Sequence, residues 1–189
     1  MKRMFLISFL FLLNGCVTEM PKYYTDAEVS YQSINCTYDK FEKKTTCITP
    51  FISNTTRSKS EDGSNRIDYV SEWDLRSMAF RTIQLDTSSD FDSIQFYFTM
   101  KQKGWAFYNA AYDEKGNKLK FVGIDSSVLD YGWTKEEFAL VVTKNYLNEY
   151  KNQELTIKLV GKKKDAIFTI QPEFIRGVIK HLQNPKRKL

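Results

Sequence analysis

The sequence predicts an α+β protein in which an antiparallel β-sheet packs with two helices. Apolar and polar residues alternate along several segments, for example DSIQFYFTMK at residues 92–101, which is typical of half-buried strands. Two segments nearer the C-terminus show helical spacing of apolar residues instead. With 42% hydrophobic and 15% aromatic residues, the chain has enough apolar material for one compact core, and no internal repeat or second domain boundary is evident.

The first residues have the layout of an export signal. Lys2 and Arg3 give a positive start, an apolar run follows at residues 4–13, and Gly15 precedes Cys16. This run is about half of the roughly 20 apolar residues that a spanning helix needs. We therefore do not expect it to remain in the membrane as a span.

The segment 13–16, LNGC, resembles the lipobox of bacterial lipoprotein precursors. The resemblance implies that residues 1–15 are removed as a signal peptide and that Cys16 is acylated, for example with palmitate, and attaches the protein to a membrane. Each buried methylene contributes about 0.8 kcal/mol, so two or more chains hold a protein stably. Val17 implies sorting to the outer membrane, facing the periplasm, in a Gram-negative host. Ordinary secretory cleavage and an uncleaved anchor are the alternatives.

The rest of the chain divides into three parts. Residues 16–30 are polar around Pro21 and are interpreted as the lipidated N-terminus and a tether. Residues 31–184 are predicted to form a single α+β domain, and residues 185–189 a basic tail.

Residues 31–51 are expected to form the first hairpin, because SINCTY and KTTCIT are rich in Thr, Ile and Tyr and flank a polar turn. In this hairpin Cys36 faces Cys47, and directly opposed side chains lie near the separation of a disulfide. An even pair of cysteines in an exported protein is typical of such a bond. Two buried free thiols are the alternative, and a redox-active role needs a spacing closer to CxxC.

A polar loop and a meander follow the hairpin. Residues 53–66 contain no hydrophobic residue and are expected to form an exposed loop. Four antiparallel strands are expected after it. The first two occupy residues 73–85 and 92–101, and the last two flank a turn at Gly116.

The segment WTKEEFALVVTKNYLNEYKN, residues 133–152, is expected to be a helix. Thr134 and Glu137 fit a capping box, with Trp133 and Phe138 as a hydrophobic staple. A strand across FALVVT is the alternative, because Val and Thr favour extended structure.

Two further elements complete the predicted fold. ELTIKLV and AIFTIQ flank GKKKD and predict a C-terminal hairpin. A last helix is expected to begin at Pro172, to carry one apolar stripe, and to end at Asn184 and Pro185.

The chain contains no familiar catalytic or metal-binding motif, so we expect no catalytic residue, no metal and no cofactor. The single histidine, His181, lies in the last turn of the terminal helix and is interpreted as a surface or capping residue. Carboxylate chemistry is the alternative, because two acids with different proton affinities can suffice. Asp125 and Asp130 are its candidates at the border of a cleft, whereas Asp113 and Glu114 are interpreted as turn residues.

Aromatic and basic residues are the remaining candidates for contact surfaces. Trp73, Trp105, Trp133 and the eleven tyrosines offer flat apolar faces for a glycan or peptide, although most are interpreted as core. Basic residues gather at 162–164 and 186–188, where a solvated turn and tail, or contact with anionic lipid, are the two interpretations. The formal net charge of +5 is modest, and no recognition module for nucleic acid is present.

The leading hypothesis is a non-enzymatic, lipid-anchored cell-envelope protein that acts as a binding or structural module for an envelope protein or glycan. The alternatives are a periplasmic hydrolase that acts on glycan or peptide through carboxylates, and an inhibitor of a lytic enzyme. The sequence does not separate the first hypothesis from the last, since both need only a binding surface.

Overall fold

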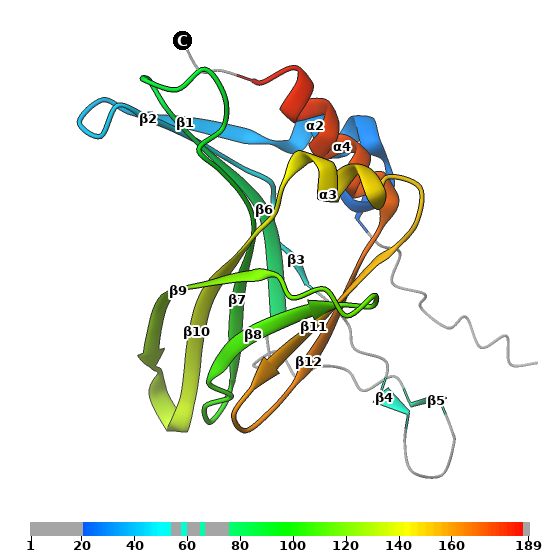
Figure 1. Ribbon diagram of the computed structural model, residues 1–189. Helices are drawn as coiled ribbons and strands as arrows, with labels where there is room; N and C mark the ends of the chain where they lie inside the picture. Colours follow the sequence, from blue (N-terminus) through cyan, green and yellow to red (C-terminus); the bar gives the residue numbers. More distant parts are fainter. Residues whose placement is uncertain (1–20, 54–57, 60–64, 67–75, 187–189) are drawn as a thin grey trace, which may run out of the picture.

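The computed structural model describes residues 21–53, 58–59, 65–66 and 76–186 (Figure 1). The predicted signal peptide, the lipidation site at Cys16, Trp73 and most of the predicted loop 53–66 lie outside these residues. Within them, antiparallel strands are combined with four α-helices, so the predicted α+β class is confirmed.

Most strands belong to one seven-stranded antiparallel sheet. Its order is β1-β2-β6-β7-β10-β9, and β3 also pairs with β6. The strands are β1 (Asn35–Asp39), β2 (Lys44–Ile48), β3 (Ile52–Ser53), β6 (Arg76–Leu85), β7 (Ser93–Lys103), β9 (Lys120–Val128) and β10 (Trp133–Val141).

A three-stranded sheet, in the order β12-β11-β8, packs against the large one (Figure 1). Phe98 of β7 stacks on Phe138 of β10 and meets Phe168 of β12 edge-on, with ring centroids 5.3 Å and 5.2 Å apart. These buried rings join the two sheets into one core. The smaller sheets contain β8 (Tyr108–Asp113), β11 (Leu155–Gly161) and β12 (Ala166–Ile170), and separately β4 (Ser58–Lys59) with β5 (Asn65–Arg66).

The N-terminal hairpin and its disulfide are confirmed. β1 pairs with β2 so that Cys36 lies opposite Cys47, and the two sulfur atoms are bonded at 2.08 Å. β2 continues the sheet by pairing with β6, which places the hairpin at one edge of the large sheet.

The predicted meander is correct for its first pair of strands and wrong for the second. β6 and β7 pair as expected, but β8 pairs with β11 in the small sheet, and β9 pairs with β10. The turn at Gly116 is present, with φ 83°, and Tyr112 and Lys118 make only an isolated bridge across it. Turn residues mark where strands end, whereas the partners of β8 and β9 come from later in the chain.

The predicted helix at 133–152 is wrong in its first half. Residues Trp133–Val141 form β10, as in the strand alternative, and only Lys144–Glu149 are helical, as α3. The buried side chains of Thr134 and Glu136 point to the same face as Phe138, so the polar residues hide the alternation that marks a strand.

The residue that caps the helix also differs from the predicted one, Thr134. Thr143 caps α3, because its hydroxyl accepts a hydrogen bond from the N–H of Tyr146 at 3.1 Å. The hydroxyl of Thr134 instead donates to the carbonyl of Gly104 at 2.9 Å and so joins β10 to a loop.

The C-terminal hairpin and the last helix are confirmed. β11 pairs with β12, and α4 (Pro172–Gln183) has proline at its first position. The apolar stripe of α4 is buried, and it includes Phe174, Ile175, Val178 and Leu182.

Two helices occupy part of the segment that was predicted as a tether. α1 (Lys22–Thr25) and α2 (Ala27–Ser33) lie beside α4 at one end of the molecule (Figure 1). A Cβ atom at Gly177 of α4 would come within 2.5 Å of the Cβ of Ser30, so glycine allows this close approach. The tether prediction is therefore wrong for residues 22–30, where the helices are too short to show a clear apolar period.

Candidate functional site

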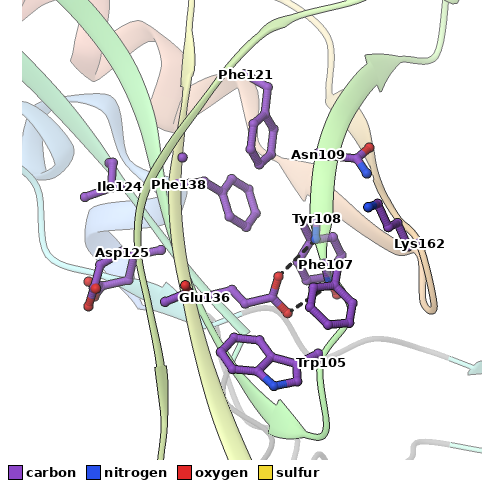
Figure 2. A pocket seen from close by; sticks show the side chains of 13 residues that line it. Trp105, Phe107, Tyr108, Asn109, Phe121, Ile124, Asp125, Glu136, Phe138 and Lys162 are labelled. Carbon is purple, nitrogen blue, oxygen red and sulfur yellow. Dashed lines mark hydrogen bonds between the residues drawn. The ribbon is translucent and has the colours of Figure 1, made fainter.

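A cavity of about 700 Å³ opens between the two sheets at one edge of the large sheet (Figure 2). β9 and β10 form one wall, and β8 with the preceding loop 104–107 forms the other. We call this region the seam: the cavity, the edge strand β9 on one side, and the loop with β8 on the other.

A buried carboxylate shapes the wall formed by β8 and its loop. Glu136 of β10 points across the cavity and accepts hydrogen bonds from the backbone N–H groups of Ala106, Phe107 and Tyr108 at 2.8, 3.2 and 3.0 Å (Figure 2). The side chain of Gln102 donates to the same carboxylate at 3.3 Å. The three N–H groups converge because Phe107 has a left-handed backbone, with φ 57°. With its acceptors occupied in this way, Glu136 holds the loop in place, and we assign it a structural role.

Two aromatic rings form the outer part of this wall. Trp105 and Phe107 stack with ring centroids 5.6 Å apart, and Phe107 is 41% exposed. The ammonium group of Lys163 lies 5.4 Å from the centroid of the Phe107 ring. Because Glu136 fixes the backbone of the loop, the pair presents a positioned apolar face. Of the tryptophans singled out from the sequence, Trp105 lines the cavity and Trp133 does not.

The wall formed by β9 leaves part of the cavity unfilled by side chains. Gly123 lies opposite Phe138 in the register, and a Cβ atom at Gly123 would meet no atom within 4 Å. Ile124 is the extra residue of a bulge between Gly123 and Asp125, and it is 43% exposed. Phe121 closes the far end by stacking on Phe138, with ring centroids 4.7 Å apart.

β9 is an edge strand, and in the described part of the chain β10 is its only partner in the sheet. The N–H of Leu129 donates to the carbonyl of Trp133 at 2.7 Å, and three steps along the same register Ser126 lies opposite Glu136. Hydrogen-bonded and non-bonded pairs alternate along an antiparallel ladder. The N–H and C=O of Ser126 therefore point away from β10, toward the open edge.

The candidate acids are not brought together in one cleft. The carboxylate of Asp125, at the cavity, pairs with Lys135 at 3.2 Å, and Glu137 pairs with the same ammonium group at 3.2 Å. Hydrogen bonds from Lys135 to Glu137 and then to Asp125 raise the pKa of Lys135. Asp130 lies in the 3-10 turn η1 (Asp130–Gly132), beyond the end of β9, and does not line the cavity.

Asp113 is a turn residue, as predicted, and it also anchors a helix. Its carboxylate accepts from the backbone N–H and the side-chain amide of Asn117 at 2.8 and 2.9 Å, and from the hydroxyls of Tyr150 and Tyr146 at 3.0 and 3.3 Å. Burial raises the pKa of Asp113, but the hydrogen bonds outweigh it and leave the pKa below its ordinary value. Burial, and next the bond to Asp113, raise the pKa of Tyr150 to about 12. The cluster fixes α3 against the turn that leads into β9.

The prediction of a surface role for His181 is wrong, because its side chain is fully buried. Its Nε2 atom lies 3.3 Å from the hydroxyl oxygen of Thr82, and its ring lies 5.6 Å from that of Phe91. Burial, with a smaller contribution from the charge of Lys186, lowers the pKa of His181 to about 4. The signal is visible in the sequence, since position 181 falls seven residues after Phe174 on the apolar stripe.

The basic turn 162–164 borders the seam. Lys162 lines the cavity, and the ammonium group of Lys164 donates to the carbonyl of Lys103 at 2.8 Å. The sequence predicts either a solvated turn or a contact with anionic lipid here, and it does not connect this turn to a site between the sheets. It also misses Gly123 and Glu136; the single signal for Gly123 is a glycine inside a strand pattern, which indicates a bulge or a close approach.

Comparisons with protein-family models, with curated proteins and with solved structures found no match to this chain. Among the helices of the described residues, none has the length and apolar character that a membrane span requires. The functional assignment therefore depends on the residues of the seam.

Proposed function

We propose that the protein is a lipid-anchored cell-envelope binding module that takes up an extended peptide segment of an envelope partner as an added strand along β9. The observation that carries this proposal is the open edge of β9 beside a cavity with an aromatic wall. A peptide that pairs with an edge strand gains main-chain hydrogen bonds. Pockets on the protein that accept every second side chain of the peptide then give specificity. Hydrolysis and inhibition of a lytic enzyme stay predictions from the sequence.

The composition of β9 supports pairing. Exposed edge strands are usually protected by charge, proline or a covering element. β9 contains only two charged residues, Lys120 and Asp125, and Lys135 already pairs with the second. Val122 and Ile124 are 37% and 43% exposed and offer apolar contacts to an added strand.

The cavity supports a peptide more than a glycan. A side chain of the added strand fits the space beside Gly123 and reaches the exposed face of Phe107. A glycan uses aromatic faces such as Trp105 and Phe107, but it leaves the edge groups of Ser126 unused. The juxtaposition of edge and cavity therefore favours a polypeptide as the ligand.

Two variants of Ser126 test the binding mode. A library of random nine-residue peptides displayed on phage is selected against the purified mature chain, and the affinities of the enriched peptides are then measured. Ser126→Pro removes the N–H that faces the open edge, and we expect at least tenfold weaker binding. Ser126→Ala keeps that N–H and is the matched control, with binding unchanged.

Two outcomes would contradict the assignment of a peptide ligand. Equal binding of the selected peptides by Ser126→Pro and the parent chain would exclude strand addition at this edge. Selective binding of envelope oligosaccharides that Phe107→Ala abolishes and Ser126→Pro leaves intact would replace the peptide by a glycan.

The anchor is tested separately, because it depends on the lipobox resemblance at Cys16. Cys16→Ala should move the protein from the membrane fraction to the soluble fraction in its native host. Val17→Asp is the matched control, since it keeps the acylated cysteine and should leave the protein in the membrane fraction. Retention of Cys16→Ala in the membrane fraction would contradict anchoring, whatever the peptide experiment shows.

A further inference from the structure

Two cysteines and the single histidine gather where the N-terminal hairpin meets α4. One ligand atom from each of Cys36, Cys47 and His181 lies within 4.8 Å of the other two. All three side chains are buried, with 7%, 3% and 0% exposure. Cys36, Cys47 and Thr82 form one row across β1, β2 and β6, and His181 covers this row from the helix.

The histidine contributes a ring nitrogen without a partner. Nε2 of His181 lies next to Thr82, and Nδ1 has no hydrogen-bond partner among the described residues although it is buried. A buried polar atom without a partner is costly, and binding of an ion is one way to satisfy it. Imidazole nitrogen and thiolate sulfur are together the preferred donors of zinc.

A fourth donor lies close to the two sulfur atoms. The carbonyl oxygen of Lys186 is 3.0 Å from Sγ of Cys36 and 3.7 Å from Sγ of Cys47. The two sulfurs are therefore close both to the imidazole of His181 and to a carbonyl oxygen. Four donors of mixed type are what a tetrahedral site requires.

We propose that, when the Cys36–Cys47 disulfide is reduced, Cys36, Cys47 and His181 bind one Zn²⁺ ion, with the carbonyl of Lys186 at the fourth position. Two thiolates neutralise the charge of Zn²⁺, which suits a buried site because an uncompensated charge there is costly. With Zn–S near 2.3 Å and Zn–N near 2.0–2.1 Å, the donors of a tetrahedral site lie roughly 3.5 Å apart. The bonded sulfurs are 2.08 Å apart, and the ligand atoms of the three residues lie within 4.8 Å of one another. Reduction therefore has to let the two sulfurs move apart, and side-chain rotations have to bring the three donors to the zinc distances.

The chemistry needs a reductant, which is a dithiol donor. The donor gives two electrons and two protons to the disulfide and becomes a disulfide itself, and the S–S bond is replaced by two thiols. Zn²⁺ then displaces the two thiol protons, which pass to solvent. The strand ladder keeps the cysteines in place meanwhile, because β2 is paired with β1 on one side and with β6 on the other.

Cobalt(II) binding to the full mature chain tests the site, because Co²⁺ reports thiolate and nitrogen donors by its absorption spectrum. The chain is reduced with a phosphine, freed of metal, and titrated with Co²⁺ and then with Zn²⁺. We expect one equivalent of Co²⁺ to give thiolate charge-transfer bands and the visible bands of a tetrahedral site, and Zn²⁺ to remove both. The chain with its disulfide intact is the control and should give neither band.

The histidine separates this site from simple thiol binding. His181→Gln keeps a polar group beside Thr82 but removes the ring nitrogen, and it should weaken Zn²⁺ binding at least tenfold and change the Co²⁺ spectrum. Cys36→Ser should also abolish the charge-transfer bands of a two-thiolate site. Near-ultraviolet circular dichroism shows whether the reduced chain keeps its fold. No Co²⁺ spectrum after reduction, or the same affinity in His181→Gln as in the parent chain, would overturn the proposal.

Discussion

The two edges of the large sheet have opposite character. β1 forms one edge, and the disulfide ties it to β2; its exposed side chains are mostly polar. β9 forms the other edge, lacks a disulfide, and exposes Val122, Ile124 and Val128, of which Ile124 lines the cavity. Unpaired backbone groups with apolar side chains are the features that attract another strand. The β1 edge is therefore cross-linked and mostly polar, whereas the β9 edge combines unpaired backbone groups with exposed apolar side chains.

The contacts that hold the two edge strands in place differ as well. β1 is held by its own hairpin partner, which is near in sequence. The surroundings of β9 depend on two buried carboxylates: Asp113 fixes the turn before the strand, and Glu136 fixes the loop on the opposite wall. The open edge is thus positioned by a few polar side chains, and its geometry is sensitive to single substitutions.

The largest effect is expected from Glu136→Gln. The amide accepts at one atom instead of two, so its NH₂ group faces either the N–H of Tyr108, which now bonds Oε2, or those of Ala106 and Phe107, which now bond Oε1. Buried donors without partners cost about 1–3 kcal/mol each, so we expect the free energy of unfolding to fall by about 3 kcal/mol in urea denaturation. Peptide binding at the seam should fall too, because the loop with Phe107 loses its fixed backbone.

The neighbouring residue on the same strand provides the control. Glu137 carries the same side chain, but it pairs with the partly exposed Lys135 and bonds Thr99 on the outer face. Glu137→Gln should cost less than Glu136→Gln, because it leaves no buried backbone N–H group without an acceptor. Similar losses for the two variants would show that Glu136 does not hold the loop.

The disulfide comes next and tests the cross-linked edge. Replacing Cys36 and Cys47 together by alanine should lower the free energy of unfolding by about 2–3 kcal/mol, because the bond closes a short loop in the unfolded chain. Binding of the selected peptides should stay unchanged, since β1 and β9 are at opposite ends of the strand order. A loss of peptide binding equal to that of Glu136→Gln would show that the two edges are coupled.

Asp113→Asn should have a smaller and pH-dependent effect. At neutral pH we expect a loss of about 1–2 kcal/mol, because Tyr150 and Asn117 lose a charged acceptor. The folded chain holds the pKa of Asp113 below its ordinary value of about 3.9, so this contribution is present above that pH and is lost as the pH falls through the lower folded value.

Urea denaturation at several pH values checks this prediction. The difference between Asp113→Asn and the parent chain should shrink below about pH 4. Glu114→Gln is the control, because Glu114 is an exposed residue of the same turn and its loss should change stability by less than about 0.5 kcal/mol at every pH. A difference that stays constant with pH would contradict the assigned role of the carboxylate.

Much of the fold follows from local patterns in the sequence. The disulfide hairpin, β6 with β7, the C-terminal hairpin and α4 all show either alternation or a helical stripe. The strands pair with neighbours close in sequence, and α4 begins at a proline. β10 breaks the rule, because Thr134 and Glu136 occupy inward positions that an apolar residue normally takes. Their polar side chains bond distant backbone groups, and nothing in the local sequence indicates those partners.

The sequence predicts much less of the seam than of the fold. Its walls come from β8, β9 and β10, and the departure of β8 to the small sheet depends on β11, more than forty residues later in the chain. Trp105 and Asp125 were candidates by residue type, but the carboxylate that builds the site is Glu136, whose role appears only when the loop 104–107 lies across from it. Long-range pairing, which periodicity does not encode, decides the site.

The smallest expected effect comes from Gly123 in β9. It has the opposite sign to the others, because the substitution should stabilise the chain. Gly123 lies inside β9 where a side chain has room, and glycine in a strand costs about 0.5–1 kcal/mol relative to alanine. Gly123→Ala should therefore raise the free energy of unfolding by about 0.5 kcal/mol, while its methyl group takes up cavity space and weakens peptide binding. Gly116→Ala is the control with the opposite sign, because φ 83° strains an L-residue and the chain should lose stability. If Gly123→Ala stabilises the chain and leaves peptide binding unchanged, the space beside Gly123 does not serve the ligand, and the pocket has to be placed elsewhere along β9.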